Sequence, residues 1–128
     1  MVKNRIALIA HDGKKAEMVA FLNQNKKFLT NFKLVATGTT GKHAIEAGFE
    51  VKCYKSGPLG GDAQIGGLIS EDKISMVFFF RDPLGKHPHE PDVQMLMRLC
   101  DVHNVPLATN PAGANLMIKG LQENTVNR

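Results

Sequence analysis

The chain has 128 residues, of which 43% are apolar and 22% are charged, a composition that predicts one globular domain over residues 1–128 and excludes a disordered or fibrous protein. No apolar run approaches the ~20 residues of a membrane span, and the apolar run at residues 6–10 is too short for a secretory signal. The net charge of +4 comes from scattered Lys and Arg with little aromatic interleaving, which argues against nucleic acid as a partner and favours small anionic ligands.

Apolar runs and stretches of helical periodicity alternate along the chain. In chain order, the pattern predicts a strand at 5–10, a helix at 14–29, a strand at 32–36, a helix at 40–47, a strand at 51–54, a helix at 63–70, a strand at 74–80, a loop at 81–91, a helix at 92–103, a strand at 105–108 and a helix at 112–119. Strands that are apolar throughout and alternate with helices are typical of a parallel sheet covered on both faces. We therefore predict a three-layer α/β/α fold, doubly wound around a mainly parallel five-stranded sheet.

The cysteines and the end of the chain point to no special chemistry. Cys53 and Cys100 have no CxxC spacing, so they predict neither a zinc site nor a disulfide framework, and a reduced, cytoplasmic protein is expected. Residues 118–128 form a mostly polar tail that is predicted to fray.

Polar residues that could carry chemistry follow the predicted strands, at the edge where doubly wound sheets bind their ligands. They are His11, Asp12 and Lys15 after the first strand, Thr37, Gly38, Thr39 and Thr40 after the second, Ser56, Gly57 and Asp62 after the third, and Asp82, His89 and Asp92 after the fourth. Each loop alone could be a capped turn. Their coincidence at one edge indicates a site.

Two of these loops have features of an anion site. Residues 56–62 hold three glycines and one proline and end in the carboxylate of Asp62, directly before a predicted helix. Residues 37–41 offer three hydroxyl groups and several N–H groups at a helix start, which suits one phosphate group, and Lys15 could supply the countercharge. The spacing of Gly38 and Gly41 is not that of a Walker loop. The alternatives are an ordinary tight turn, a Thr-capped turn and a solvated surface lysine.

The loop at 81–91 and the residue after it are rich in His and Asp. Pro88 between the two histidines makes metal chelation by that pair doubtful, and no third ligand has an obvious spacing, so no metal is expected. Asp92 could simply cap the following helix. A histidine near carboxylates could also form an acid–base cluster. Together, a phosphate-binding loop at 37–41, the carboxylate of Asp62 and a His–Asp pair suit a reaction that removes a proton from the carbon beside the carbonyl of a small phosphorylated compound.

Several segments together resemble the methylglyoxal synthase family, in order and across about residues 5–118. They are residues 10–12 (AHD), 36–41 (ATGTTG), 56–62 (SGPLGGD), 79–84 (FFRDPL), 88–92 (PHEPD) and 106–110 (PLATN). The resemblance implies a lyase that converts dihydroxyacetone phosphate to methylglyoxal and inorganic phosphate through an enediolate. It implies no organic cofactor and no metal, and it implies a homohexamer that phosphate inhibits.

The resemblance also implies a role for each matching position. Asp62 would be the general base, His89 would hydrogen-bond the carbonyl and hydroxyl oxygens, and Asp92 would assist. The residues implied to bind substrate are His11, Lys15, Thr37, Gly38, Thr39, Thr40, Ser56, Gly57 and His89. The roles of Asp12 and Asp82 stay open.

Three other functions are compatible with parts of the pattern. A non-catalytic domain of the same fold would bind a phosphorylated effector without turnover, and the joint presence of Asp62, His89 and Asp92 argues against it. An isomerase of phosphorylated sugars would release no phosphate. A receiver-type signalling domain would need an acidic pair after the first strand, which the sequence lacks.

Overall fold

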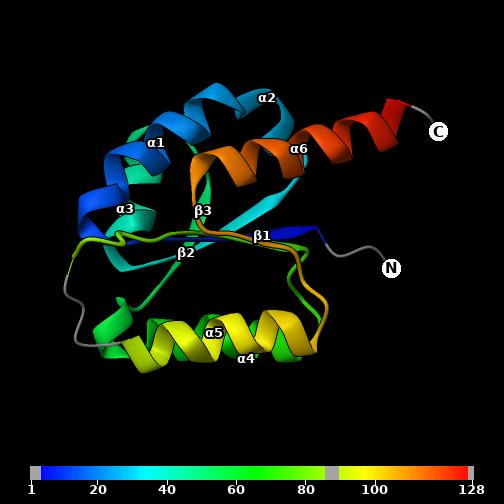
Figure 1. The fold of residues 1–128 in the computed structure, drawn as a ribbon. Helices are drawn as coiled ribbons and strands as arrows, with labels where there is room; N and C mark the ends of the chain where they lie inside the picture. Colours follow the sequence, from blue (N-terminus) through cyan, green and yellow to red (C-terminus); the bar gives the residue numbers. More distant parts are fainter. Residues whose placement is uncertain (1–3, 86–89, 127–128) are drawn as a thin grey trace.

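Five parallel strands form one sheet with helices on both of its faces in the computed structural model, which describes residues 4–85 and 90–126 (Figure 1). The elements are β1 (Arg5–Ala10), η1 (Asp12–Lys14), α1 (Lys15–Gln24), α2 (Lys26–Leu29), β2 (Lys33–Thr37), α3 (Gly38–Glu46), β3 (Val51–Tyr54), η2 (Gly57–Leu59), α4 (Gly61–Ser70), β4 (Met76–Phe80), α5 (Glu90–Val102), β5 (Leu107–Ala108) and α6 (Pro111–Val126). The predicted three-layer, doubly wound fold is confirmed.

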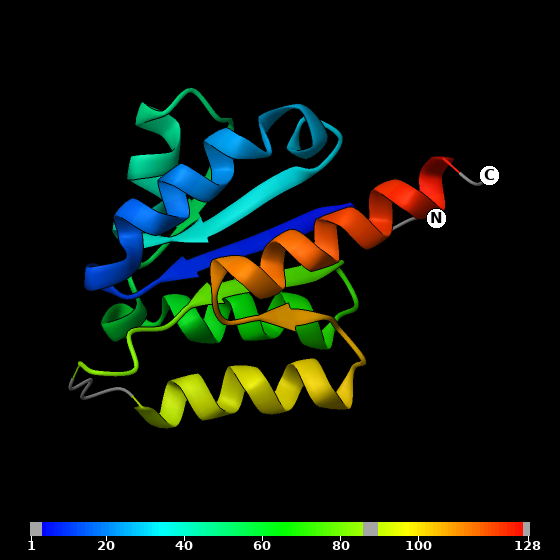
Figure 2. The ribbon, with the colours of Figure 1, turned by 45° about the horizontal axis from the view of Figure 1, so that its top comes forward.

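The strands lie in the order β3-β2-β1-β4-β5. From β1 the chain first adds β2 and β3 on one side, and it then returns to add β4 and β5 on the other side. Helices α1, α2, α3 and α6 lie on one face, and α4 and α5 lie on the other (Figures 1 and 2). The chain therefore leaves β1 toward one face and leaves β4 toward the other. Between two neighbouring strands whose connections diverge in this way, a crevice forms beyond their carboxyl ends.

Side chains that alternate along the strands supply a separate core on each face of the sheet. Phe78 and Phe80 of β4 point toward α1, where both rings stand edge-on to Phe21 with centroid distances of 5.1 and 5.4 Å. Phe79, between them, faces the other core together with Ile65 of α4. All three phenylalanines of β4 are buried, as their apolar run predicts. The two cores fix the helices against the sheet, and so fix the loops that follow the strands.

The helix predicted over 14–29 is interrupted, which corrects that prediction. Residues 12–14 form a 3-10 turn, and Asn25 separates α1 from α2 with φ −116° and ψ 21°. The Asn25 side chain donates to the carbonyl oxygen of Phe21 at 2.9 Å and to Oδ1 of Asn115 at 3.1 Å. An asparagine that bonds the backbone locally offers the chain an alternative to continued helix. The predicted strand at 74–80 is also shorter, since β4 begins at Met76.

The last helix, α6, continues to Val126, so the predicted end at residue 119 is wrong. Ile118 is only 2% exposed, and Leu121 packs against the same core cluster as Ala114. These apolar side chains at helical spacing hold the helix on the sheet beyond the point where the sequence turns polar. Within the described parts of the chain, no helix is long and apolar enough to cross a bilayer.

The two cysteines, both free, lie in contrasting environments and give a simple test of the fold. Cys53 on β3 is exposed, whereas burial, with a contribution from the charge of Asp101, raises the pKa of Cys100 to about 11. Because the thiolate is the reactive form, iodoacetamide at pH 8 is expected to label Cys53 and to spare Cys100 in the native protein. Mass spectrometry of tryptic peptides measures this. Both residues should react after unfolding, and equal labelling of Cys100 in the native state would contradict the packing of α5.

Candidate active site

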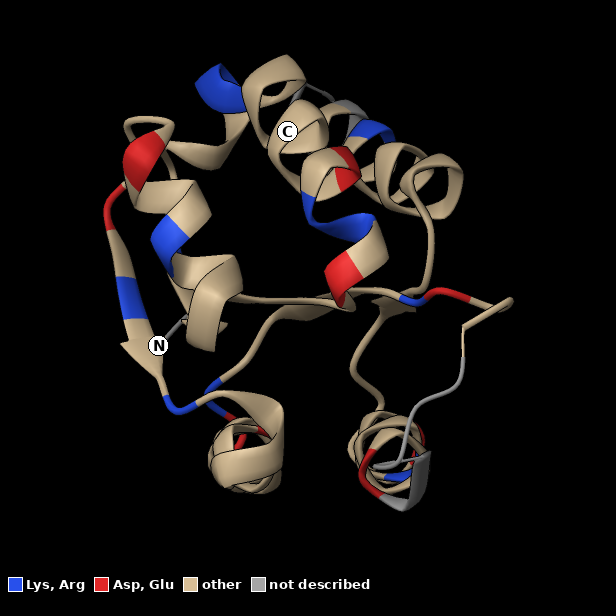
Figure 3. Ribbon diagram, turned by 90° about the vertical axis from the view of Figure 1, so that its left-hand side faces the viewer, with Lys and Arg blue, Asp and Glu red and all other residues tan. Residues whose placement is uncertain are grey.

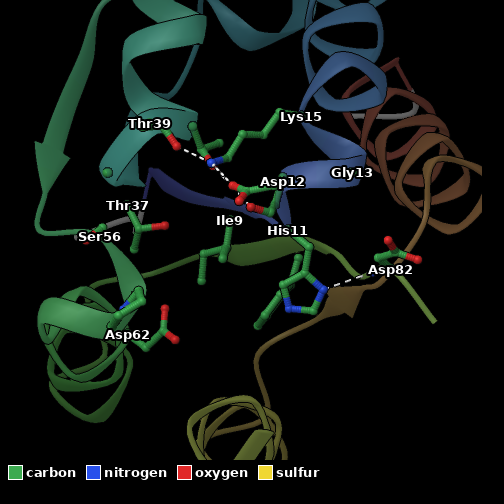
Figure 4. Close-up of a pocket in the computed structure, with 16 residues that line it drawn as sticks. Ile9, His11, Asp12, Gly13, Lys15, Thr37, Thr39, Ser56, Asp62 and Asp82 are labelled. Atoms are coloured by element: carbon green, nitrogen blue, oxygen red, sulfur yellow. Dashed lines mark hydrogen bonds and ion pairs between the residues drawn. The ribbon is translucent and has the colours of Figure 1, made fainter. Parts of the chain in front are cut away.

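The carboxyl ends of β1, β2 and β4 and the loop after β3 surround a cavity of about 540 Å³ (Figure 4). Its lining consists of Ile9, Ala10, His11, Asp12, Gly13, Lys15, Thr37, Gly38, Thr39, Thr40, Ser56, Gly57, Pro58, Asp62, Phe79 and Asp82. The structure thus brings together residues from four loops that the sequence placed at one edge of the sheet. Figure 3, which looks onto this edge, shows both basic and acidic residues on the elements around it.

Residues 37–41, here called the threonine loop, form the start of α3. Thr37 is the N-cap of this helix with an extended backbone (ψ 143°), and Thr39 and Thr40 lie in the first turn. Gly38 has φ +39°, and a Cβ there would lie 2.8 Å from the Cα of Ser56, so only glycine allows the two loops to approach this closely. The N–H groups of a first helical turn have no partner within their own helix and carry partial positive charge. The loop is therefore suited to an oxyanion.

Lys15 places a cation beside this helix start. Its Nζ donates to Oγ1 of Thr39 and lies 2.5 Å from Oδ1 of Asp12 (Figure 4). The Lys15 side chain is 17% exposed, whereas that of Asp12 is 96% exposed. Thr40 is buried and its hydroxyl donates to the carbonyl oxygen of Ala10 at 3.5 Å, which links α3 to the end of β1. Lys15 and the threonines therefore line the same cavity.

Helix α4 carries Asp62, a residue that is only 3% exposed. Helix α4 begins at Gly61, two residues earlier than predicted, so Asp62 lies in the first helical turn, where a negative charge is favoured. A Cβ on Gly57 would lie 3.2 and 3.4 Å from the two Asp62 carboxylate oxygens. The glycine loop, residues 56–60, therefore packs its bare backbone against the carboxylate. Asp62 lies on the opposite side of the cavity from Lys15 (Figure 4).

The ring of His11 is fixed by two contacts. Its Nδ1 accepts a hydrogen bond from the backbone N–H of Asp82 at 2.9 Å, and the ring stands edge-on to Phe79 at 5.3 Å between centroids. A ring nitrogen that accepts carries no proton, so the proton of the neutral imidazole is assigned to Nε2. Ala10 pairs with Phe80 in the register of β1 and β4. His11, which follows Ala10, therefore lies beside the start of the loop that follows Phe80.

Two further site residues, His89 and Asp92, were predicted after the fourth strand. His89 lies outside the described residues. Asp92 is half-buried in the first turn of α5 and does not contribute to the cavity lining. Conversely, Ile9 and Phe79 line the cavity with apolar side chains although the sequence pattern did not predict them as site residues. Their only signal was their position at the end of buried strands beside polar loops.

The fold and the cavity define a doubly wound α/β protein with a candidate ligand site between β1 and β4, the neighbouring strands whose connections diverge. Comparison with known proteins identifies it more closely, since the MGS-like domain family matches residues 17–109. Methylglyoxal synthase of Borreliella afzelii (strain PKo) is 56% identical over 122 residues, which cover 94% of this chain and 96% of that protein. Methylglyoxal synthase of Clostridium botulinum (strain Eklund 17B / Type B) is 58% identical over 116 residues, 90% of this chain and 98% of that protein.

A solved structure agrees with these relatives. The crystal structure of methylglyoxal synthase from Elizabethkingia anophelis NUHP1 superposes with a TM-score of 0.86 at 45% identity, covering 91% of this chain and 77% of that one. The chain belongs to the methylglyoxal synthase family.

Proposed function

We propose that the protein is a lyase that converts dihydroxyacetone phosphate to methylglyoxal and inorganic phosphate, with Asp62 as the general base. The membership of the family supports the reaction. The observation that carries the mechanism is the position of the buried Asp62 carboxylate in the same cavity as the threonine loop and Lys15.

The phosphate group would bind at the start of α3. Thr37, Thr39 and Ser56 supply hydroxyl donors to this part of the cavity, and Gly38 and Gly57 allow close approach of backbone N–H groups. Thr40 would contribute through its backbone, since its hydroxyl donates to Ala10. Lys15 would exchange its hydrogen bond to the Thr39 hydroxyl for one to a phosphate oxygen, which is a stronger acceptor than a hydroxyl group.

Asp62 would remove a proton from the hydroxymethyl carbon, and the electron pair would pass to the carbonyl oxygen to give an enediolate. A positioned base of this kind contributes about 10²–10⁴-fold to a proton transfer. The Nε2–H of His11 is a donor that its contact with Asp82 keeps in one orientation. By the family resemblance, His89 would donate to the carbonyl and hydroxyl oxygens, and Asp92 would assist. These donors would stabilise the negative charge that develops.

The fate of the enediolate depends on the orientation of the phosphate. If the C–O bond to phosphate lies parallel to the π orbitals, the electron pair expels inorganic phosphate, and the resulting enol takes up a proton to become methylglyoxal. The threonine loop and Lys15 would hold the bond out of the enediolate plane. A bond held in that plane would give an isomerase instead.

The direct test is incubation with dihydroxyacetone phosphate while inorganic phosphate and a dicarbonyl trap are measured together. The proposal predicts equal amounts of phosphate and methylglyoxal. An aldehyde isomer without phosphate release would identify an isomerase, and binding without turnover would identify the non-catalytic phosphate-ligand-binding domain. The family resemblance also implies a homohexamer inhibited by phosphate, and light scattering after size exclusion would measure its mass. The cysteine pattern predicts a cytoplasmic protein.

Replacing Lys15 with methionine is expected to weaken substrate binding while leaving the base in place. One charged hydrogen bond to phosphate is lost, so KM should rise by about 10- to 100-fold. Lys14→Met is the matched control, because Lys14 is the adjacent residue and pairs with Glu17 at 3.3 Å instead of facing the threonine loop. Steady-state kinetics would measure both variants. A similar rise in KM for both would mean that general charge, and not the position of Lys15, attracts the substrate.

A further inference from the structure

Gln64 lies in the first turn of α4, two residues after Asp62, and its side chain reaches back to the end of β3. Its Oε1 accepts a hydrogen bond from the backbone N–H of Lys55 at 2.9 Å. Lys55 directly follows β3 and directly precedes Ser56 and Gly57. The bond therefore ties the start of the loop at 56–60 to the helix that carries the carboxylate.

Further contacts close this loop on itself. The carbonyl oxygen of Ser56 accepts from the N–H of Gly61 at 2.9 Å. A Cβ on Gly61 would lie only 1.7 Å from the carbonyl oxygen of Lys55, so the end of β3 and the start of α4 touch through their backbones. Gly57, inside the closed loop, packs against the Asp62 carboxylate. A shift of Lys55 would thus move the loop relative to the carboxylate.

We propose that Gln64 is a positioning residue, which fixes the loop carrying Ser56 and Gly57 at its distance from Asp62. The catalytic consequence rests on the proposed function, whereas the consequence for phosphate binding does not. The Gln64 side chain is exposed and belongs to neither core cluster. Its replacement therefore acts on the loop and leaves the packed core intact. Misplacement of reacting groups by about 1 Å can cost on the order of 100-fold in rate.

The test uses variants that separate the acceptor from the size of the side chain. Gln64→Met keeps the length but removes the acceptor, and kcat is expected to fall about tenfold. The Kd of inorganic phosphate, measured by calorimetry, should rise about fivefold, the effect of one hydrogen bond. Gln64→Glu keeps an acceptor oxygen and should restore kcat to within about threefold of the parent. Gln24→Met, the same exchange at an exposed position at the far end of α1, should change neither value.

Each outcome decides the role of Gln64. Parental kcat and phosphate Kd in Gln64→Met would overturn the inference, and so would an equal loss of kcat in Gln64→Met and Gln64→Glu. If the parent releases no phosphate from dihydroxyacetone phosphate, the proposed function fails. The phosphate Kd of Gln64→Met then still supports the inference if it is raised and overturns it if it is unchanged. A parent that binds no phosphate would overturn both proposals.

Discussion

Replacement of Asp62 with asparagine is expected to remove nearly all turnover and to leave the fold and the phosphate site intact. Asparagine has almost the same shape but cannot accept a proton, so kcat should fall by about 10³-fold. The loss of a negative charge from the cavity should leave phosphate binding equal or tighter. Rapid-quench or steady-state assays of phosphate release, with calorimetry of inorganic phosphate binding, would measure the two effects.

Asp72→Asn provides the matched control for this variant. Asp72 follows the other end of α4 and is exposed, with φ 58°, a conformation that asparagine tolerates well. The Asp72→Asn variant has the same change of charge and shape as Asp62→Asn, but away from the cavity, and should keep parental activity. Near-normal methylglyoxal production by Asp62→Asn would reject Asp62 as the base. A loss of phosphate binding together with activity would instead indicate that Asp62 holds the site together.

Replacement of Gly61 with alanine is expected to produce the largest loss of stability among single methyl additions in the loop at 55–61. The new Cβ would lie 1.7 Å from the carbonyl oxygen and 2.6 Å from the carbonyl carbon of Lys55. Both are backbone atoms, so the end of β3 or the start of α4 has to move. Strain of this kind typically costs about 1–3 kcal/mol, and we expect the upper end, about 3 kcal/mol. Urea unfolding would measure the free energy of unfolding.

Gly67→Ala tests whether the loss of stability in Gly61→Ala comes from the contact with Lys55 or from placing alanine in α4. Gly67 lies in the same helix, α4, and a Cβ there meets nothing within 4 Å. Alanine at this position is expected to stabilise the protein by about 0.5–1 kcal/mol, because it has the higher helix propensity. Equal effects of the two substitutions would contradict the close approach of Lys55 to Gly61. The same variant, Gly61→Ala, should also lose activity, since Ser56 and Gly57 would shift with Lys55.

The layers of the fold could be predicted because they depend on local pattern. The buried run at 76–80 and the helical spacing in α5 each specify an element without reference to distant residues. The break at Asn25 could not be predicted in the same way, because the side chain also bonds Asn115, 90 residues away. The length of α6 likewise depends on Ile118 and Leu121 finding a core that the whole fold creates.

In the candidate site, too, local features could be predicted from the sequence, whereas contacts between distant residues could not. The threonine loop and the glycine loop were visible as residues at strand ends, and the parallel sheet brings them to one cavity. The contact of His11 with the backbone of Asp82 joins residues 71 positions apart, and no local signal marks it. The requirement for glycine at position 38 is also non-local, because it arises from the neighbouring Ser56.

A crystal structure with 2-phosphoglycolate, a planar analogue of the enediolate, would test the central geometry most directly. We expect the phosphate group within about 3 Å of the Thr39 hydroxyl and the Lys15 ammonium. The analogue's carboxylate is expected beside Asp62 in the same cavity. A phosphate group bound away from the start of α3, or an Asp62 side chain turned out of the cavity, would contradict it.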